Sequence, residues 1–293
     1  MNLGVVLPTL ELGPDPAAIR EYAQTAQALG YTHLVIQDHV LGVDPAVHIG
    51  WSRPYTNKTL TPDPFIQAAF LSTAVPGMEL VTGVVVLTQR QTVLVAKQAA
   101  EVDIMTKGHF RLGVGIGWNN VEYQALGEDF TNRGVRSEEQ VELMRALWTQ
   151  PSITFNGKWH QIDAAGINPL PVQRPIPVWF GGASDSVLKR TARMGDGWIT
   201  SPQVQTYEAN RAMLDRLYGF AEEVGRDPAS IGIEGRIELV DNPTEQDVLR
   251  AYREWHDLGV DIVTLSTRAV GLDSPRQQMD ALKKYMGLST NLS

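Results

Sequence analysis

The sequence contains no cysteine, so disulfide bonds and thiolate metal sites are excluded. Its six histidines show neither HxH nor HExxH spacing, and we predict no metal site from them. Long hydrophobic runs are missing as well: no stretch approaches the roughly 18 apolar residues of a membrane-spanning helix. We therefore expect a soluble protein of the reducing cytoplasm, without a membrane partner.

Runs of lysine or arginine are also absent. The 25 basic residues are outnumbered by 33 acidic ones, and the formal net charge of −8 argues against a nucleic-acid partner. Hydrophobic residues make up 43% of the 293 residues and charged residues 20%, which is typical of a globular protein. The opening "MNLGVVLPTLELG" has no basic segment and is interrupted by proline, so we predict a first strand there, not a signal peptide.

Strand-like and helix-like patterns alternate along the whole chain. The predicted strands are residues 3–8, 33–39, 78–87, 110–117, 177–182, 197–200, 231–240 and 261–267. The predicted helices are residues 16–29, 62–75, 92–106, 136–148, 184–194, 206–224, 244–258 and 275–286. Continuous apolar strands between amphipathic helices indicate a parallel sheet covered by helices. Eight such units predict a (β/α)8 TIM barrel of the α/β class, formed by a single domain, 1–293.

One segment interrupts this alternation before the fifth strand. Residues 153–162, "ITFNGKWHQI", carry Asn156-Gly157 between strand-like flanks. Asn-Gly is a strong short-range signal for a hairpin turn. We therefore predict a β-hairpin insertion at this point.

The second predicted strand ends in Asp38-His39. Functional groups of such barrels lie at the C-terminal ends of the strands, and burying these two side chains is costly unless they are paired or used. Imidazole is the side chain best suited to proton transfer near neutral pH, which makes His39 the better acid–base candidate. On spacing alone, a histidine that caps the strand and bonds to a loop is equally compatible.

Glycines stand out in the third and fourth predicted strands. Gly83 lies among β-branched residues, which marks a bulge or the close approach of another group. The segment "LGVGIGWNN" (112–120) has GxGxG spacing, which differs from the dinucleotide fingerprint. Its glycines allow a flat ligand or a phosphate to approach the backbone. Trp118 either lines a pocket or packs against a helix.

The fifth predicted strand ends at Gly181-Gly182, and a helix follows Ala183. Backbone N–H groups at a helix N-terminus form a ready anion site, and phosphate is the expected ligand. The alternative is a plain N-cap, Ser184 or Asp185, after a flexible turn. We favour phosphate binding because this loop lies at the predicted barrel mouth.

Together these segments resemble the bacterial luciferase-like superfamily, and more narrowly its branch of oxidoreductases that use the deazaflavin coenzyme F420. The resemblance covers nearly the whole chain. It rests on "DH" (38–39), "TGVVVLTQRQTVLVAKQAAEVD" (82–103), "FRLGVGIGWNNVEYQALG" (110–127), "NRG" (132–134), "PVQRPIPVWFGG" (171–182) and "RMGDGWI" (193–199). It implies that the cofactor ring lies at the barrel mouth, above a non-proline cis peptide bond at Gly83–Val84.

The resemblance also implies roles for individual residues. His39 is the predicted catalytic residue, which handles the proton that accompanies hydride transfer. Backbone groups of the fifth strand's glycines are expected to bind the cofactor phosphate. The full predicted cofactor-binding set is Asp38, Gly83, Val84, Gly115, Gly117, Trp118, Asn119, Gly181, Gly182 and Ala183.

The predicted function is hydride transfer between F420 and a small organic substrate. An FMN-dependent monooxygenase of the same superfamily is the alternative. Related F420-dependent sugar-phosphate dehydrogenases carry an acid where this chain has Trp118, which argues against a sugar phosphate. With Trp51 and Tyr55, this tryptophan suggests an apolar or aromatic substrate. Three basic residues are candidates for contact with the anionic tail of F420, namely Arg53, Lys58 and Arg90.

Two other hypotheses stay open. A cofactor-binding carrier or sensor without turnover would retain binding after His39→Ala and would show no activity to lose. An aldo-keto reductase lacks support, because we find no suitable set of Tyr, Lys, Asp and His. Family members commonly form dimers through their outer helices, so the resemblance implies a homodimer.

Overall fold

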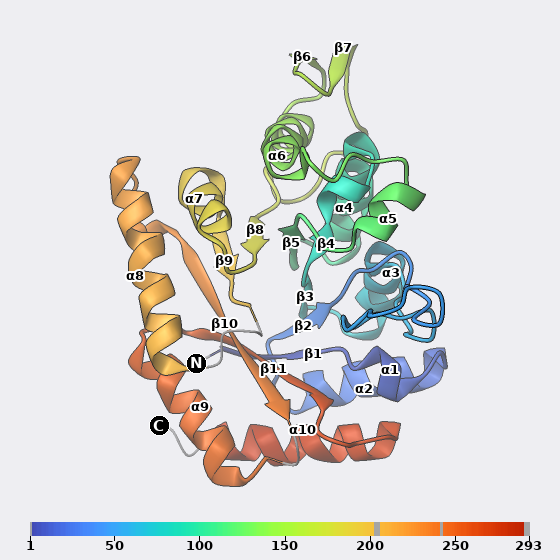
Figure 1. Ribbon diagram of the computed structural model, residues 1–293, viewed down its shortest axis with the longest axis vertical. Helices are drawn as coiled ribbons and strands as arrows, with labels where there is room; N and C mark the ends of the chain where they lie inside the picture. Colours follow the sequence, from blue (N-terminus) through green and yellow to red (C-terminus); the bar gives the residue numbers. More distant parts are fainter. Residues whose placement is uncertain (1, 202–205, 241–242, 290–293) are drawn as a thin grey trace.

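The computed structural model describes residues 2–201, 206–240 and 243–289, whose parallel strands close into a barrel (Figure 1). Its strands are β1 (Asn2–Val6), β2 (His33–Ile36), β3 (Glu79–Thr82), β4 (Val85–Val86), β5 (Phe110–Gly115), β8 (Val178–Gly181), β9 (Gly197–Ile199), β10 (Gly232–Val240) and β11 (Ile262–Ala269). They pair in the order β3-β2-β1-β11-β10-β9-β8-β5-β4, and a β3–β5 pairing completes the ring. The third predicted strand is split into β3 and β4, which share one of the eight positions. The prediction of a (β/α)8 barrel is confirmed.

Helices surround this barrel (Figure 1). They are α1 (Thr9–Leu12), α2 (Pro16–Ala28), α3 (Pro64–Ala74), α4 (Thr92–Met105), α5 (Asn120–Ala125), α6 (Arg133–Thr149), α7 (Asp185–Met194), α8 (Tyr207–Glu223), α9 (Glu245–Asp257) and α10 (Pro275–Ser289), with 3-10 turns η1 (Leu87–Gln89) and η2 (Pro228–Ser230). All eight predicted helices are present. The short helices α1 and α5 were not predicted, because one or two turns carry too little periodicity to detect. None of the helices described is long and apolar enough to cross a membrane.

The predicted hairpin is present as β6 (Ile153–Asn156) and β7 (Gln161–Ala165), beyond α6 and away from the barrel (Figure 1). Its turn differs from the prediction. Asn156 pairs with Gln161, so residues 157–160 form the connection instead of a two-residue Asn-Gly turn. Glu139 on α6 explains the wider loop, because its carboxylate accepts hydrogen bonds from the backbone of Trp159 and His160 at 2.8 and 2.9 Å.

A network of buried charges fills the barrel interior near the N-terminal ends of the strands. Glu234 is fully buried, with Oε2 2.9 Å from Arg111 Nη1 and Oε1 3.1 Å from Arg236 Nε. Thr264 Oγ1 donates to the same Oε1 at 2.8 Å. Burial opposes ionisation of Glu234, but Arg111 and Arg236 outweigh it and lower its pKa to about 2. This network fills the lower part of the barrel interior with side chains.

Candidate active site

A cavity of about 950 Å³ opens at the C-terminal ends of the barrel strands, within the size range of small-molecule sites. Loops that follow nearly every barrel strand contribute to its wall. The predicted site residues that line it are Asp38, His39, Gly83, Val84, Gly115, Gly117, Trp118, Gly181, Gly182 and Ala183. Sequence reasoning therefore located the cavity, and only one predicted residue lies elsewhere.

That residue is Asn119, which does not line the cavity. It is the N-cap of α5, and its side-chain Oδ1 accepts a hydrogen bond from the backbone N–H of Val121 at 3.1 Å. The side chain is buried, at 1% exposure. The structure thus gives Asn119 a role in starting the helix, and its binding of the cofactor stays a prediction.

His39 is held at the cavity by a residue that the sequence analysis missed, Glu122 on α5. His39 Nδ1 lies 3.0 Å from Glu122 Oε2 and 3.1 Å from Oε1. Glu122 is completely buried and also accepts hydrogen bonds from the backbone N–H groups of Val40 at 2.9 Å and Leu41 at 3.2 Å. Gln89 Nε2 donates to it at 3.2 Å. These contacts fix the carboxylate, and the carboxylate in turn fixes the imidazole.

This pairing decides which imidazole nitrogen is left for a ligand. Burial alone would raise the pKa of Glu122, but the hydrogen bond and charge of His39 and the backbone N–H of Leu41 outweigh burial and lower its pKa. An ionised carboxylate only accepts hydrogen bonds, so we assign the proton on His39 to Nδ1. Nε2 is then the atom with which His39 can exchange a proton at the cavity.

Asp38 lines the cavity, but its carboxylate is engaged within the protein. Oδ2 accepts from the backbone N–H of Val86 at 2.9 Å, and Oδ1 accepts from Arg90 Nη2 at 2.8 Å. Arg90 also donates to Asp63 at 2.9 Å. The structure therefore places Arg90 between two carboxylates, and its contact with an anionic tail stays a prediction. Asp38 positions strand β4 beside the cavity.

Aromatic side chains cover His39 on one side of the cavity. The ring centroids of His39 and Tyr55 are 3.8 Å apart, and Trp118 lies 5.6 Å from His39. Trp51 packs behind Trp118 at 5.7 Å without lining the cavity. The guanidinium of Arg53 lies 5.6 Å above the Trp118 ring. These rings cover the imidazole, and His39 is only 7% exposed.

The adjacent wall is made largely of backbone. A Cβ atom added to Gly115 would lie 2.6 Å from Val84 Cγ2, and one added to Gly181 would lie 2.6 Å from Val84 Cγ1. Val84 therefore packs between two glycines, and any side chain at either position would displace it. The Gly83–Val84 peptide bond is cis, as predicted. A wall of this kind allows a flat ring to approach the main chain closely.

Helix α7 begins beside this wall. Its N-cap, Ser184, makes no side-chain capping hydrogen bond, and Asp185 is turned to Arg216 at 2.7 Å. The first N–H groups of a helix have no partner within the helix, and together with the helix dipole they favour an anion. Gly182 precedes them with φ of 134°, a conformation that favours glycine. The site thus fits a flat ring that carries a phosphate.

These features agree with the comparisons with known proteins. Residues 1–287 match the family model for luciferase-like monooxygenases. The chain belongs to this family. An uncharacterized protein of Mycobacterium tuberculosis is 29% identical over 273 residues, which is 89% of either chain. The solved structure of an F420-dependent secondary alcohol dehydrogenase has the same fold, with a TM-score of 0.79 and 16% identity over 98% of both chains.

Two further relatives of this luciferase-like chain differ in cofactor. An F420-dependent glucose-6-phosphate dehydrogenase of Segniliparus rotundus is 26% identical over 91% of this chain and 76% of its own length. An FMNH2-dependent dimethylsulfone monooxygenase of Pseudomonas fluorescens is 32% identical, but over 43% of this chain and 35% of its own. Relatives of the protein thus use either a deazaflavin or a flavin.

The cavity at the barrel mouth of this luciferase-like protein is also lined by charged residues that the sequence analysis missed. They are Glu11 after β1, Arg236 and Glu238 on β10, and Arg268 on β11. A signal was available for two of them. In "GRIELV", Arg236 and Glu238 alternate with apolar residues, so both side chains point to the same face of a strand that is otherwise buried.

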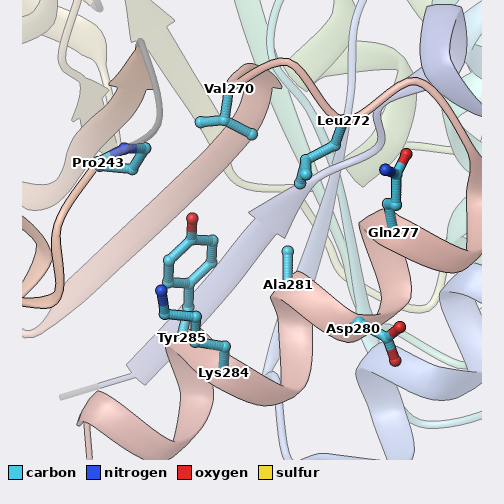
Figure 2. Close-up of a pocket in the computed structure, with 8 residues that line it drawn as sticks. All are labelled: Pro243, Val270, Leu272, Gln277, Asp280, Ala281, Lys284 and Tyr285. Atoms are coloured by element: carbon cyan, nitrogen blue, oxygen red, sulfur yellow. The ribbon is translucent and has the colours of Figure 1, made fainter.

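A second, smaller cavity of about 460 Å³ lies outside the barrel, between Pro243, the segment after β11 and α10 (Figure 2). Its charged groups are Asp280 and Lys284. Among the described residues that line it there is no histidine, and Asp280 contributes a single carboxylate. Within the part of the chain that the structure describes, no three His, Asp or Glu side chains gather as a metal site.

Proposed function

We propose that this luciferase-like protein is an F420-dependent oxidoreductase, which transfers a hydride between F420 and a small organic substrate with an apolar or aromatic body. One observation carries the proposal: His39, oriented by the buried Glu122, lies beside a glycine-lined wall that ends at an open helix N-terminus. A proton-transfer group thus stands next to a place for a flat, phosphorylated cofactor.

The chain's own residues have distinct parts in this reaction. Gly115 and Gly181 leave the backbone open to the ring, and the N-terminus of α7 would hold the phosphate. Bound deazaflavin supplies the hydride acceptor or donor. His39 Nε2 gives or takes the accompanying proton, while Glu122 keeps the other ring nitrogen protonated and stabilises the imidazolium. Tyr55 and Trp118 keep water away and contact the apolar body of the substrate.

The length over which this chain matches its relatives supports F420 over FMN as the cofactor. The F420-dependent relative matches 91% of this chain, whereas the FMNH2-dependent one matches 43%. The titration of the purified protein with F420 and, separately, with FMN tests this preference through quenching of each cofactor's fluorescence. We expect micromolar or tighter binding of F420 and much weaker binding of FMN. The reverse order would point to an FMN-dependent monooxygenase, and binding of neither would overturn both.

A matched pair of variants shows whether the binding occurs in this cavity. Gly181→Val places a branched side chain where even a Cβ atom would collide with Val84, so we expect F420 affinity to fall at least tenfold. Gly219→Ala lies on α8, where an added Cβ meets nothing within 4 Å, and should bind F420 as the wild type does. Circular dichroism of both variants checks that they are folded.

We also propose a cytoplasmic homodimer whose partner is a small molecule and not a nucleic acid or a membrane. Apolar side chains at the start of α3 and α4 support the dimer: Ile66 is 72% exposed and Leu94 52%. These two helices pack against each other, so the two side chains belong to adjoining elements. Light scattering after size exclusion should give twice the mass of the chain, and Ile66→Glu with Leu94→Glu should halve it.

A further inference from the structure

The proposed hydride transfer does not use the polar side of the cavity. Arg236 and Glu238 lie two positions apart on β10, both facing the cavity, with Arg268 on the neighbouring strand β11. This side differs from the glycine-lined wall of β5 and β8, because charged side chains and not backbone atoms cover it. We call this side of the cavity, formed by Arg236, Glu238 and Arg268, the polar wall.

Arg236 brings free donors to the polar wall. Its side chain is only 8% exposed, and Nε lies 3.1 Å from Glu234 Oε1 in the network below. Its backbone N–H donates to Thr200 Oγ1 at 2.9 Å, which fixes the strand. Neither Nη1 nor Nη2 donates a hydrogen bond to any residue that the structure describes. A guanidinium has five N–H donors, so those on the two Nη atoms are available to a ligand.

Glu238 brings a free acceptor beside these donors. Its Oε1 accepts from Ser266 Oγ at 2.7 Å and lies 3.5 Å from Arg268 Nη2. Its Oε2 accepts no hydrogen bond from the described residues, and the side chain retains 15% exposure at the cavity. Arg268 is already engaged, because it also donates to Gln37. It therefore holds Glu238 in place and has less to offer a ligand.

The balance of charge decides which ligand this wall suits. The three guanidinium groups of Arg111, Arg236 and Arg268 are matched by three carboxylates, those of Glu79, Glu234 and Glu238, so these charges cancel. Nearby Glu11 adds no positive charge, and burial raises the pKa of its carboxyl. An anionic ligand would lose hydration without meeting a net positive charge. An apolar ligand would leave the buried Nη donors unpaired, which costs about 1–3 kcal/mol for each group.

A hydroxyl group meets both requirements, since it donates one hydrogen bond and accepts others. We propose that Arg236 and Glu238 bind a hydroxyl group of an uncharged substrate, with Arg236 Nη donating a hydrogen bond to its oxygen and Glu238 Oε2 accepting a hydrogen bond from its O–H. The substrate is thus an amphipathic hydroxylated molecule, whose apolar body faces Tyr55 and Trp118. The assignment of this ligand as the substrate rests on the proposed function, whereas the binding of the hydroxyl does not.

Three probes of similar size test this specificity on the full chain: 1-phenyl-1,2-ethanediol, phenylacetate and ethylbenzene. Their dissociation constants are measured by ligand-observed NMR, with and without F420. We expect the diol to bind about tenfold more tightly than the other two, the difference that one hydrogen bond to a charged group supplies. Phenylacetate as the tightest ligand would show an anion site, and equal or undetectable binding of all three would likewise overturn the proposal.

Two conservative variants locate the diol. Glu238→Gln keeps an acceptor for Ser266 but removes the charge, and Arg236→Lys keeps a cation near Glu234 but removes the forked donors. Each should bring the affinity for the diol down to that of ethylbenzene, with an unchanged circular dichroism spectrum. Lys284→Gln, at the second cavity (Figure 2), should leave all three constants unchanged. A diol preference that survives both wall variants would place the diol elsewhere and overturn the proposal.

The same variants keep this proposal separate from the proposed function. F420 titrated into Glu238→Gln should bind as tightly as to the wild type, because this change leaves Gly115, Gly181 and the N-terminus of α7 as they are. If the wild type binds no F420, the proposed function fails while the order of the three probes still decides the role of the wall. If F420 binds and the probe order is wrong, only the polar wall proposal fails.

Discussion

Two histidines at opposite ends of β2 show how position changes the chemistry of one side chain. His33 begins the strand, and its Nε2 lies 2.7 Å from Thr264 Oγ1 inside the barrel. Burial lowers its pKa to about 3, so it is neutral at physiological pH. His39 follows the end of the strand, with Nδ1 on a carboxylate and Nε2 left for the cavity.

Their acidic neighbours differ in the same way. Glu234 meets two guanidinium groups and the Thr264 hydroxyl, so both of its carboxylate oxygens are paired inside the barrel. Glu122 is equally buried, but it is paired with an imidazole that opens on the cavity. The ion pairs of Glu234 fill the barrel interior. The pairing of Glu122 with His39, in contrast, leaves Nε2 of the imidazole available for proton transfer. Burial of charge alone therefore does not mark an active site.

Removal of the lower carboxylate should have the largest effect. Glu234→Gln leaves Arg236 buried without its counter-charge and Arg111 with only the half-exposed Glu79, so we expect the free energy of unfolding to fall by about 3–5 kcal/mol in urea denaturation. Glu79→Gln is the matched control, since that carboxylate also pairs with Arg111 but is 37% exposed, and it should cost less than about 1 kcal/mol. Equal losses would mean that the two carboxylates do not differ as the structure indicates.

Removal of the upper imidazole should affect turnover and not stability. His39→Ala should lower the rate of hydride transfer about 10²–10⁴-fold, the usual contribution of general acid–base catalysis, while F420 affinity stays within about threefold of the wild type. The rate is followed by the absorbance of oxidised F420 with a substrate found by screening alcohols. His109→Ala, exposed just before β5, serves as the control. An unchanged rate in His39→Ala would remove the catalytic role.

The burial of neutral His33 should make the free energy of unfolding depend on pH. It stays neutral in the folded protein down to about pH 3, whereas in the unfolded chain it binds a proton below about pH 6.5. The unfolded state therefore binds more protons between these values, and stability falls as the pH falls from 6.5 to 3, by up to about 1.4 kcal/mol per pH unit. His33→Asn should flatten this slope in urea denaturation at several pH values. A slope identical to that of the wild type would contradict the burial of His33 in its neutral form.

The smallest expected effect comes from Glu122→Gln. The amide still reaches His39 but carries no charge, so we expect hydride transfer to slow about tenfold, which is about 1.4 kcal/mol. The folded protein lowers the pKa of Glu122 below 4.5, so its stabilisation is complete above that pH and disappears as the pH falls through the lowered value. The free energy of unfolding of the variant should therefore fall less steeply than that of the wild type as the pH drops below 4.5. A rate equal to that of the wild type would mean that Glu122 does not assist His39.

The sequence predicted the barrel well because periodicity reports burial directly. Apolar strands and one-sided helices occur in the order that the structure shows, and glycines at strand ends indicated where backbone lines the cavity. The role of Glu122 was not predicted, because its contact with His39 joins residues 83 positions apart and depends on a helix of six residues. The ion pairs of Arg90 were not predicted, because its two carboxylate partners lie at opposite ends of the long loop between β2 and α3.

The sequence by itself determined which residues share a face and where strands and helices alternate, because side-chain direction follows from local geometry. It thus placed Arg236 and Glu238 together on one side of β10. Only the tertiary structure decided that this side faces a cavity, that Glu234 pairs with Arg236 and that neither Nη atom donates to a residue the structure describes. Closure of the barrel brings distant strands together, and no local pattern records which side chains then meet.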